Sequence, residues 1–156
     1  MLAIAIPGFR QLELAHLVLD FNGTLAIDGR LIPGVREALD TLADRVEIHV
    51  VTADTFGCAR SELSGLPVKL TIIPLESQAE AKLEYVEKLG ADRVCAIGNG
   101  RNDRKMLAAA AVSVALMQRE GGAGEALACA AIVACDVLDA LDLLRHPSRL
   151  IATLRS

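Results

Sequence analysis

Polar residues follow three of the short apolar runs in this sequence, and their types suit one kind of chemistry. The clusters are Asp20-Phe21-Asn22-Gly23-Thr24, Thr52-Ala53-Asp54 and Gly98-Asn99-Gly100-Arg101-Asn102-Asp103. Lys82 lies between the second cluster and the third. Together they supply carboxylates, a hydroxyl group, main-chain amides and an ammonium group. Such groups can hold a phosphoryl group beside a divalent cation, with a carboxylate as nucleophile or metal ligand.

A parallel β-sheet would bring these clusters together. Asp20 ends the apolar run of residues 16–19, which is typical of a central strand covered on both faces. Further strands are predicted at residues 46–51, 68–73, 93–97, 112–116 and 132–133, and helices at 33–43, 55–63, 77–89, 104–110, 125–130 and 137–144. This alternation predicts βαβ units, hence an α/β fold with a central parallel sheet of five to six strands. Ligands bind at the carboxyl ends of such strands, so the clusters are expected at one edge.

Local patterns predict how some of these elements begin and end. Ser77 and Glu80 match a capping box at the start of the helix that contains Lys82. Asp28-Gly29 between apolar residues predicts a two-residue hairpin, which we interpret as a small β-flap beside the site. The apolar run at residues 2–6 predicts an edge strand, and the helix at residues 137–144 is expected to be the last.

Composition and charge exclude several classes of protein. The 156 residues carry a net charge of −4, whereas a general binder of nucleic acid or anionic membranes needs a basic face. The longest uncharged apolar run, residues 106–118, is shorter than the roughly 20 residues that span a bilayer. No basic residues precede the apolar N-terminal stretch, so we expect no signal peptide and a cytoplasmic protein. We also expect a single domain over residues 1–156.

The four cysteines favour reduced thiols over a disulfide framework or a zinc site. They form no CxxC pair, and Cys95 and Cys129 lie in apolar runs. Buried, reduced thiols are therefore expected.

In order and spacing, the polar clusters resemble the four motifs of the haloacid dehalogenase (HAD) superfamily. Within it, they are most similar to the phosphorylation domain of P-type ATPases and its soluble relatives. The first motif, Asp-x-Asp-Gly-Thr (Asp-Lys-Thr-Gly-Thr in the ATPases), corresponds to residues 20–24. The second motif, a threonine or serine, corresponds to Thr52, and the third, a lysine, to Lys82. The fourth, Gly-Asp-Gly-x-Asn-Asp, corresponds to residues 98–103, and the similarity extends from about Leu17 to Leu144.

The resemblance implies a three-layer α/β/α Rossmann-like fold, Mg²⁺ as cofactor and a role for each matched residue. The catalytic residues would be Asp20, Asn22, Thr52 and Lys82. The phosphorylated substrate would be bound by Phe21, Gly23, Thr24, Thr52, Ala53, Lys82 and Asn102. The metal ligands would come from Asp20, Asn22, Asn99 and Asp103. In this scheme Asp20 forms an aspartyl-phosphate, and Asn22 ligates Mg²⁺ through its main-chain carbonyl.

Two residues depart from the motifs of the superfamily. Asn22 stands where its phosphatases have a general acid/base aspartate. An amide does not exchange a proton near neutral pH, so protonation of the leaving group and hydrolysis of the phosphoenzyme should both be slow. Asn99 replaces a carboxylate expected to bind Mg²⁺ directly, and hard Mg²⁺ prefers anionic oxygen, so its affinity should fall.

Taken one at a time, the candidate residues have plainer explanations. Thr52 could cap the helix that follows it, and Lys82 could be a solvated helix residue. Gly98-Asn99-Gly100 could be a tight turn or half of a dinucleotide-binding fingerprint, but Asp103 occupies the place of the third glycine. His49 lies within an apolar strand and is interpreted as structural.

The spacing of the motifs leaves no room for the cap domains that the superfamily often inserts. An open site suits a large substrate or a neighbouring subunit, and the strand at residues 2–6 could pair with another chain in a homo-oligomer. Two hypotheses follow. One is a capless Mg²⁺-dependent phosphohydrolase or phosphotransferase, and the other is a catalytically degenerate protein that binds phosphate or a partner. Use of ATP does not follow from the resemblance, because the ATPases bind ATP through a separate domain.

Overall fold

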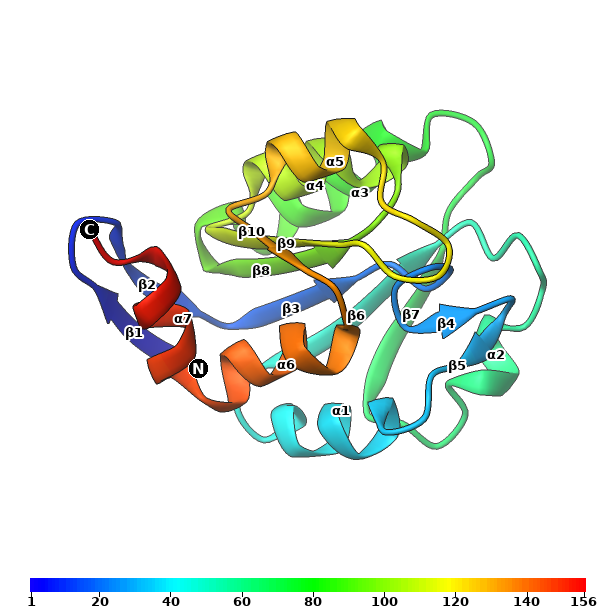
Figure 1. The fold of residues 1–156 in the computed structure, drawn as a ribbon. Coiled ribbons are helices and arrows are strands. Elements are labelled where there is room, and N and C mark those ends of the chain that lie inside the picture. The colour runs from blue at the N-terminus through cyan, green and yellow to red at the C-terminus, as the bar shows by residue number, and fades with distance from the viewer.

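A six-stranded parallel sheet forms the centre of the molecule, and β3 lies between β6 and β8 (Figure 1). The computed structural model describes residues 1–156. The strand order is β10-β9-β8-β3-β6-β7. The strands are β3 (His16–Leu19), β6 (Glu47–Thr52), β7 (Val68–Ile72), β8 (Val94–Gly98), β9 (Val112–Leu116) and β10 (Ile132–Ala134).

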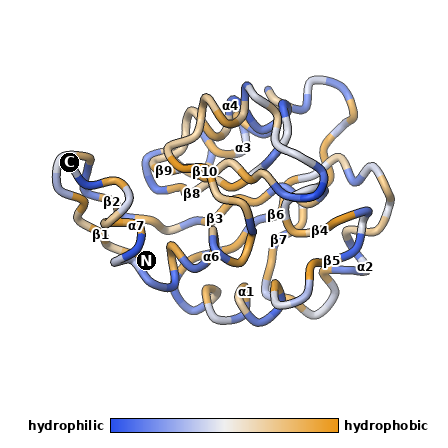
Figure 2. Tube along the Cα trace, in the orientation of Figure 1, coloured by the Kyte–Doolittle hydropathy of each residue, from blue (hydrophilic) through white to orange (hydrophobic).

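Helices cover both faces of this sheet (Figure 1). One face carries α3 (Gln78–Leu89), α4 (Arg104–Ala109) and α5 (Gly124–Cys129), and the other carries α1 (Val35–Ala43) and α6 (Val137–Arg145). Buried residues of β3 alternate between the two cores, with Leu17 and Leu19 in one and Val18 in the other. Figure 2 shows the apolar character of β8, β9 and β10. The predicted three-layer α/β/α fold is confirmed, and none of its helices has the length and apolar composition to cross a membrane.

The two ends of the chain differ from expectation. β1 (Leu2–Ile6) pairs antiparallel with β2 (Arg10–Leu14) in a separate hairpin, so it is not an edge strand of the main sheet. The helix predicted at residues 137–144 is confirmed as α6, but it is not the last helix, because Pro147 begins α7 (Pro147–Leu154). The hairpin has one buried apolar face, and α7 packs beside β1 with its Leu150 buried (Figure 1).

The hairpin of the flap is confirmed, but one predicted capping box is absent and one predicted helix start is wrong. β4 (Ala26–Ile27) and β5 (Arg30–Leu31) flank Asp28-Gly29, whose positive φ angles of 51° and 77° suit a tight hairpin turn. The predicted capping box is absent, because Ser77 has a φ of 54° and its side chain caps nothing. The helix predicted at residues 55–63 is the shorter α2 (Ala59–Glu62), since Asp54 and Gly57 turn the chain with positive φ before it.

The burial of the cysteine thiols and of His49 tests two further predictions from the sequence. Cys95 is buried, and burial raises the pKa of its thiol to about 12. Cys129, at the end of α5, and Cys135 are exposed, so the expectation of buried thiols was wrong for both. His49 is buried in β6, and burial lowers the pKa of its imidazole to about 4, so the ring is neutral at pH 7.

Candidate active site

The carboxyl ends of β3, β6 and β8 surround a small cavity of about 180 Å³. β3 leads directly into Asp20, β6 ends at Thr52, and β8 ends at Gly98. The cavity is lined by Asp20, Asn22, Thr52, Ala53, Thr55, Gln78, Asn99, Gly100 and Asn102. The topology therefore brings all four motifs to one edge of the sheet, as the sequence predicts.

Lys82 joins two acids at the base of this cavity. Its ammonium group donates to Oδ1 of Asp20 at 2.9 Å and to Oδ1 of Asp103 at 2.6 Å. Lys82 and Asp103 are 0% exposed and do not line the cavity, whereas Asp20 is 6% exposed and does. A buried charge is stable only when it is paired, so one ammonium group between two carboxylates fixes the position of all three.

Burial and charge set the protonation of this triad. Burial and then the Asp103 carboxylate raise the pKa of Asp20 to about 7, against the opposing effect of Lys82. Burial lowers the pKa of Lys82, but the two carboxylates outweigh it and the net pKa is raised. The lysine therefore stays protonated, and the excess carboxylate charge favours a cation beside Asp20.

Gly98 leaves the space that the Asp103 carboxylate occupies. Oδ2 of Asp103 accepts the N–H groups of Asn99 at 3.1 Å and Gly100 at 2.9 Å, across the turn into the 3₁₀ helix Arg101–Asp103. A Cβ atom at Gly98 would overlap this carboxylate. The glycine is needed for close approach of a side chain to the backbone.

We expect Gly98→Ala to displace Asp103 and lower the free energy of unfolding by about 1–3 kcal/mol, because the added methyl group overpacks a buried site. Urea denaturation measures the loss. Gly124→Ala is the matched control, since a Cβ there meets no atom within 4 Å. Equal stability of the two variants would contradict this explanation of Gly98.

Neighbouring residues fix two side chains on the cavity wall. The Thr52 hydroxyl accepts the N–H of Asp54 at 3.0 Å, and Nδ2 of Asn102 donates to Oε1 of Gln78 at 2.6 Å. Sequence reasoning missed Gln78 and also Thr55. Gln78 begins α3 four residues before Lys82, and this spacing, which places both on one helix face, was a usable signal.

Asn22 presents oxygen atoms that have no partner in the protein. Its side-chain Oδ1 is buried and accepts no hydrogen bond. The turn hydrogen bonds around it run from Gly23 N–H to Ala26 O and from Ala26 N–H to Phe21 O, which leaves the Asn22 carbonyl unbonded. A buried side-chain oxygen without a donor is rare, and side-chain and main-chain carbonyl oxygens are ligands that Mg²⁺ accepts.

Asn99 has a different set of contacts from those expected of a metal ligand. Its Oδ1 accepts the Thr24 hydroxyl at 3.3 Å, and its Nδ2 donates to the Gly121 carbonyl at 3.1 Å. Gly23, with a φ of 76°, leaves room for this amide, because a Cβ there would overlap it. The Phe21 side chain is fully buried in the core, so its contribution to a site is limited to its main chain.

Gln118 supports the first motif and was not found from the sequence. Its Nε2 donates to the carbonyl oxygens of Gly23 at 3.1 Å and Thr24 at 3.0 Å. Its Oε1 accepts the N–H of Val137 at 2.8 Å, at the start of α6. A polar residue shortly after the apolar run of β9 was the available signal.

The fold matches solved phosphatases. The chain covers 94% of the 3-deoxy-D-manno-octulosonate 8-phosphate phosphatase of Moraxella catarrhalis, a structure with magnesium, phosphate and KDO, at a TM-score of 0.71 and 14% identity. It covers 94% of the cobalt-bound Haemophilus influenzae phosphatase YrbI at a TM-score of 0.71 and 13% identity. It covers 96% of BT1666 of Bacteroides thetaiotaomicron, a HAD phosphatase, at a TM-score of 0.59 and 13% identity. In these three comparisons, 92%, 92% and 90% of the present chain is aligned.

The chain thus has the fold of these phosphatases, some of which are named as HAD superfamily proteins, while its resemblance to P-type ATPases stays a prediction. No family model matches the sequence. The sequence is similar to two proteins of Methanocaldococcus jannaschii, uncharacterized proteins MJ0072 and MJ0073. MJ0072 is 49% identical over 39 residues, 25% of this chain and 89% of its own length. MJ0073 is 37% identical over 83 residues, 51% of this chain and 89% of its own length, and the chain belongs to one family with both.

Proposed function

We propose that this protein is a Mg²⁺-dependent phosphohydrolase or phosphotransferase of the HAD type that acts through an aspartyl-phosphate on Asp20. The bridge from Lys82 to Asp20 and Asp103 carries this proposal. It places a carboxylate at a cavity and a fixed ammonium group next to it, as nucleophilic attack on an anionic phosphoryl group requires. The phosphatases that share the fold support the same class of reaction.

The reaction has two displacements at phosphorus. A carboxylate oxygen of Asp20 attacks phosphorus, the bond from phosphorus to the leaving-group oxygen breaks, and that oxygen takes a proton from solvent. Water then attacks the aspartyl-phosphate, one of its protons passes to solvent, and the Asp20 carboxylate and inorganic phosphate are released. The Thr52 hydroxyl and the main chain at Ala53 hold phosphoryl oxygens, and Lys82 balances their charge.

The oxygen atoms around the cavity fit Mg²⁺. Asp20 and the free oxygens of Asn22 would hold the ion directly, and Asp103 would act from below by its charge and by fixing Lys82. Bound Mg²⁺ supplies charge stabilisation to the phosphoryl oxygens. Because Asn99 replaces a second carboxylate at the cavity, we expect the affinity for Mg²⁺ to be weak.

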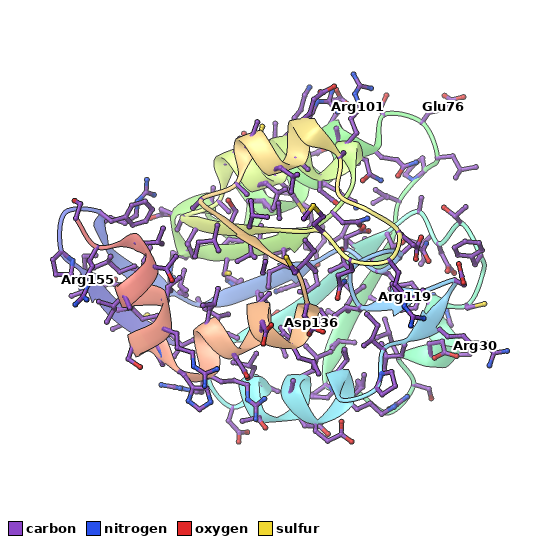
Figure 3. The ribbon with its side chains drawn as sticks, viewed as in Figure 1. Arg30, Glu76, Arg101, Arg119, Asp136 and Arg155 are labelled. Carbon is purple, nitrogen blue, oxygen red and sulfur yellow. The ribbon has the colours of Figure 1, made fainter.

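The size of the cavity limits what can enter it. A volume of about 180 Å³ suits a phosphoryl group, whereas sites for drug-sized ligands span about 300–1,000 Å³. The rest of the substrate must therefore lie outside. A neighbouring cavity of about 360 Å³ shares Gln78 and Asn102 with the first and adds Glu80, Arg101 and Arg104. Figure 3 shows Arg101 at the outer surface of the molecule. We infer that a polar leaving group extends over these residues.

Asn22 and Asn99 favour a second candidate, a degenerate protein that binds phosphate or a partner without turnover. Neither amide supplies the proton or the charge that a carboxylate would at these positions.

Replacing Asn22 with aspartate separates the two candidates. We expect slow, Mg²⁺-dependent phosphate release from p-nitrophenyl phosphate and acetyl phosphate by the wild-type protein, and none with EDTA. Asn22→Asp should raise kcat by about 10²-fold or more, because general acid catalysis contributes 10²–10⁴-fold. The control is the double variant Asp20→Asn/Asn22→Asp, which should be inactive. If neither the wild type nor Asn22→Asp turns over, the binding role is correct and the enzymatic one is not.

A further inference from the structure

His16, Glu47 and His49 lie near the amino ends of β3 and β6, whereas the cavity lies at the carboxyl ends of these strands. Figure 1 shows the two strands side by side. In the parallel register, His16 pairs with Glu47, and His49 is the next residue of β6 on the same face. One ligand atom from each of the three residues lies within 4.8 Å of the others. The cluster is therefore formed by register, from residues that are distant in the sequence.

Two of the three separations between these atoms match the edges of a metal coordination tetrahedron, and the third, from His16 to the Glu47 carboxylate, lies within 4.8 Å. Nδ1 of His16 lies 3.1 Å from Nε2 of His49, which lies 3.4 Å from Oε1 of Glu47. Ligands at about 2.0–2.1 Å from a tetrahedral zinc ion stand about 3.3 Å apart. Glu47 is exposed and His16 half-buried, so an ion can enter from solvent and keep a fourth position for water.

Tyr85 of α3 orients the buried imidazole. Its hydroxyl lies 2.9 Å from Nδ1 of His49. If Nδ1–H donates to this oxygen, Nε2 keeps a lone pair directed at His16 and Glu47. A partner on the second ring nitrogen is the usual support of a metal-binding histidine, because it fixes the tautomer.

We propose that His16, Glu47 and His49 form a binding site for a transition-metal ion of the zinc type. The ligands are Nδ1 of His16, Nε2 of His49 and the Glu47 carboxylate. Two imidazoles and a carboxylate select zinc, cobalt, nickel or copper over magnesium, whereas the cavity at Asp20 offers oxygen alone. A bound ion would tie β3 to β6 at the end away from Asp20 and Thr52.

Lys69 competes with a metal ion for the Glu47 carboxylate. It forms an ion pair with Glu47 from β7, where it lies beside His49 in the sheet. Its positive charge and that of Arg93, which also acts on His16, oppose a bound cation. Removing the Lys69 charge should free the carboxylate and tighten metal binding.

Cobalt is the probe for the test, because tetrahedral Co²⁺ absorbs visible light far more strongly than hydrated Co²⁺. Metal-free protein is titrated with Co²⁺ in excess Mg²⁺, which occupies the oxygen site at Asp20. We expect saturation at one Co²⁺ per chain and a rise in Tm with Zn²⁺. Because His49 is buried, the test variants are His16→Gln and Glu47→Gln, each expected to weaken binding at least tenfold.

Three further variants make the test specific. Lys69→Met should bind Co²⁺ several-fold more tightly, whereas Lys105→Met, which removes the exposed partner of Glu80, should not change binding. Asp20→Asn should also bind normally. Binding that is unchanged in His16→Gln, or lost in Asp20→Asn, would overturn the proposal, as would the absence of a saturable Co²⁺ spectrum in the wild type.

Discussion

Replacing Asp20 with asparagine is expected to lower phosphate release at least about a thousandfold, a change of about 4 kcal/mol in the activation barrier. The amide lacks the nucleophilic oxygen that forms the aspartyl-phosphate. Incubation with radiolabelled acetyl phosphate provides a second measurement. The wild type should retain acid-precipitable label that hydroxylamine removes, and Asp20→Asn should retain none.

The fold of Asp20→Asn should remain intact, so lost activity would report chemistry. The substitution leaves Lys82 paired with Asp103, and it removes the carboxylate whose pKa both burial and Asp103 raise. The melting temperature should therefore be unchanged or higher. Asp28→Asn is the matched control, because Asp28 is an exposed flap residue with positive φ, which asparagine tolerates. Activity that survives in Asp20→Asn would refute Asp20 as the nucleophile.

Replacing Lys82 with methionine is expected to cause the largest loss of stability at the site. Asp20 and Asp103 would then face each other in a buried environment without a cation. Removing one partner of a buried charge network costs about 3–5 kcal/mol. For a chain of this length the loss corresponds to a fall in Tm of roughly 10 °C, which thermal unfolding by circular dichroism measures.

The stability of Lys82→Met should also depend on pH in a defined direction. Without the ammonium group, the folded-state pKa of Asp20 would rise further above the ordinary value of 3.8. Protons would then bind the folded protein more tightly than the unfolded chain. The variant should therefore be most stable in acid and lose stability as the pH rises toward neutrality and above.

Two variants check the cause of this loss. Asp103→Asn in the Lys82→Met background should restore part of the stability, since it removes one of the two uncompensated charges. Lys105→Met removes an exposed lysine from the neighbouring region and should leave Tm nearly unchanged. A pH-independent loss in Lys82→Met, without rescue, would show that packing and not charge determines the role of Lys82.

The amino-acid pattern was sufficient for the architecture. Short apolar runs alternate with amphipathic helices, and this periodicity is a local property that survives in the folded chain as β3, β6, β8 and β9. It also put Asp20 and Thr52 at strand ends, and parallel topology then requires these ends to meet. The pattern failed where contacts between distant segments determine the pairing of a strand. β1 pairs with β2 in a hairpin that packs against α7, and it does not join the main sheet.

The sequence by itself determined which chemical groups stand at the carboxyl edge of the sheet, because strand ends are coded by local periodicity and turn residues. Only the tertiary structure decided what each group faces. It put Lys82 and Asp103 beneath the cavity instead of on its wall, and it engaged the Asn99 amide in hydrogen bonds with Thr24 and Gly121. It also brought His16 to His49 through strand register. Such contacts depend on long-range packing and on the direction of each side chain, and neither is present in a local pattern.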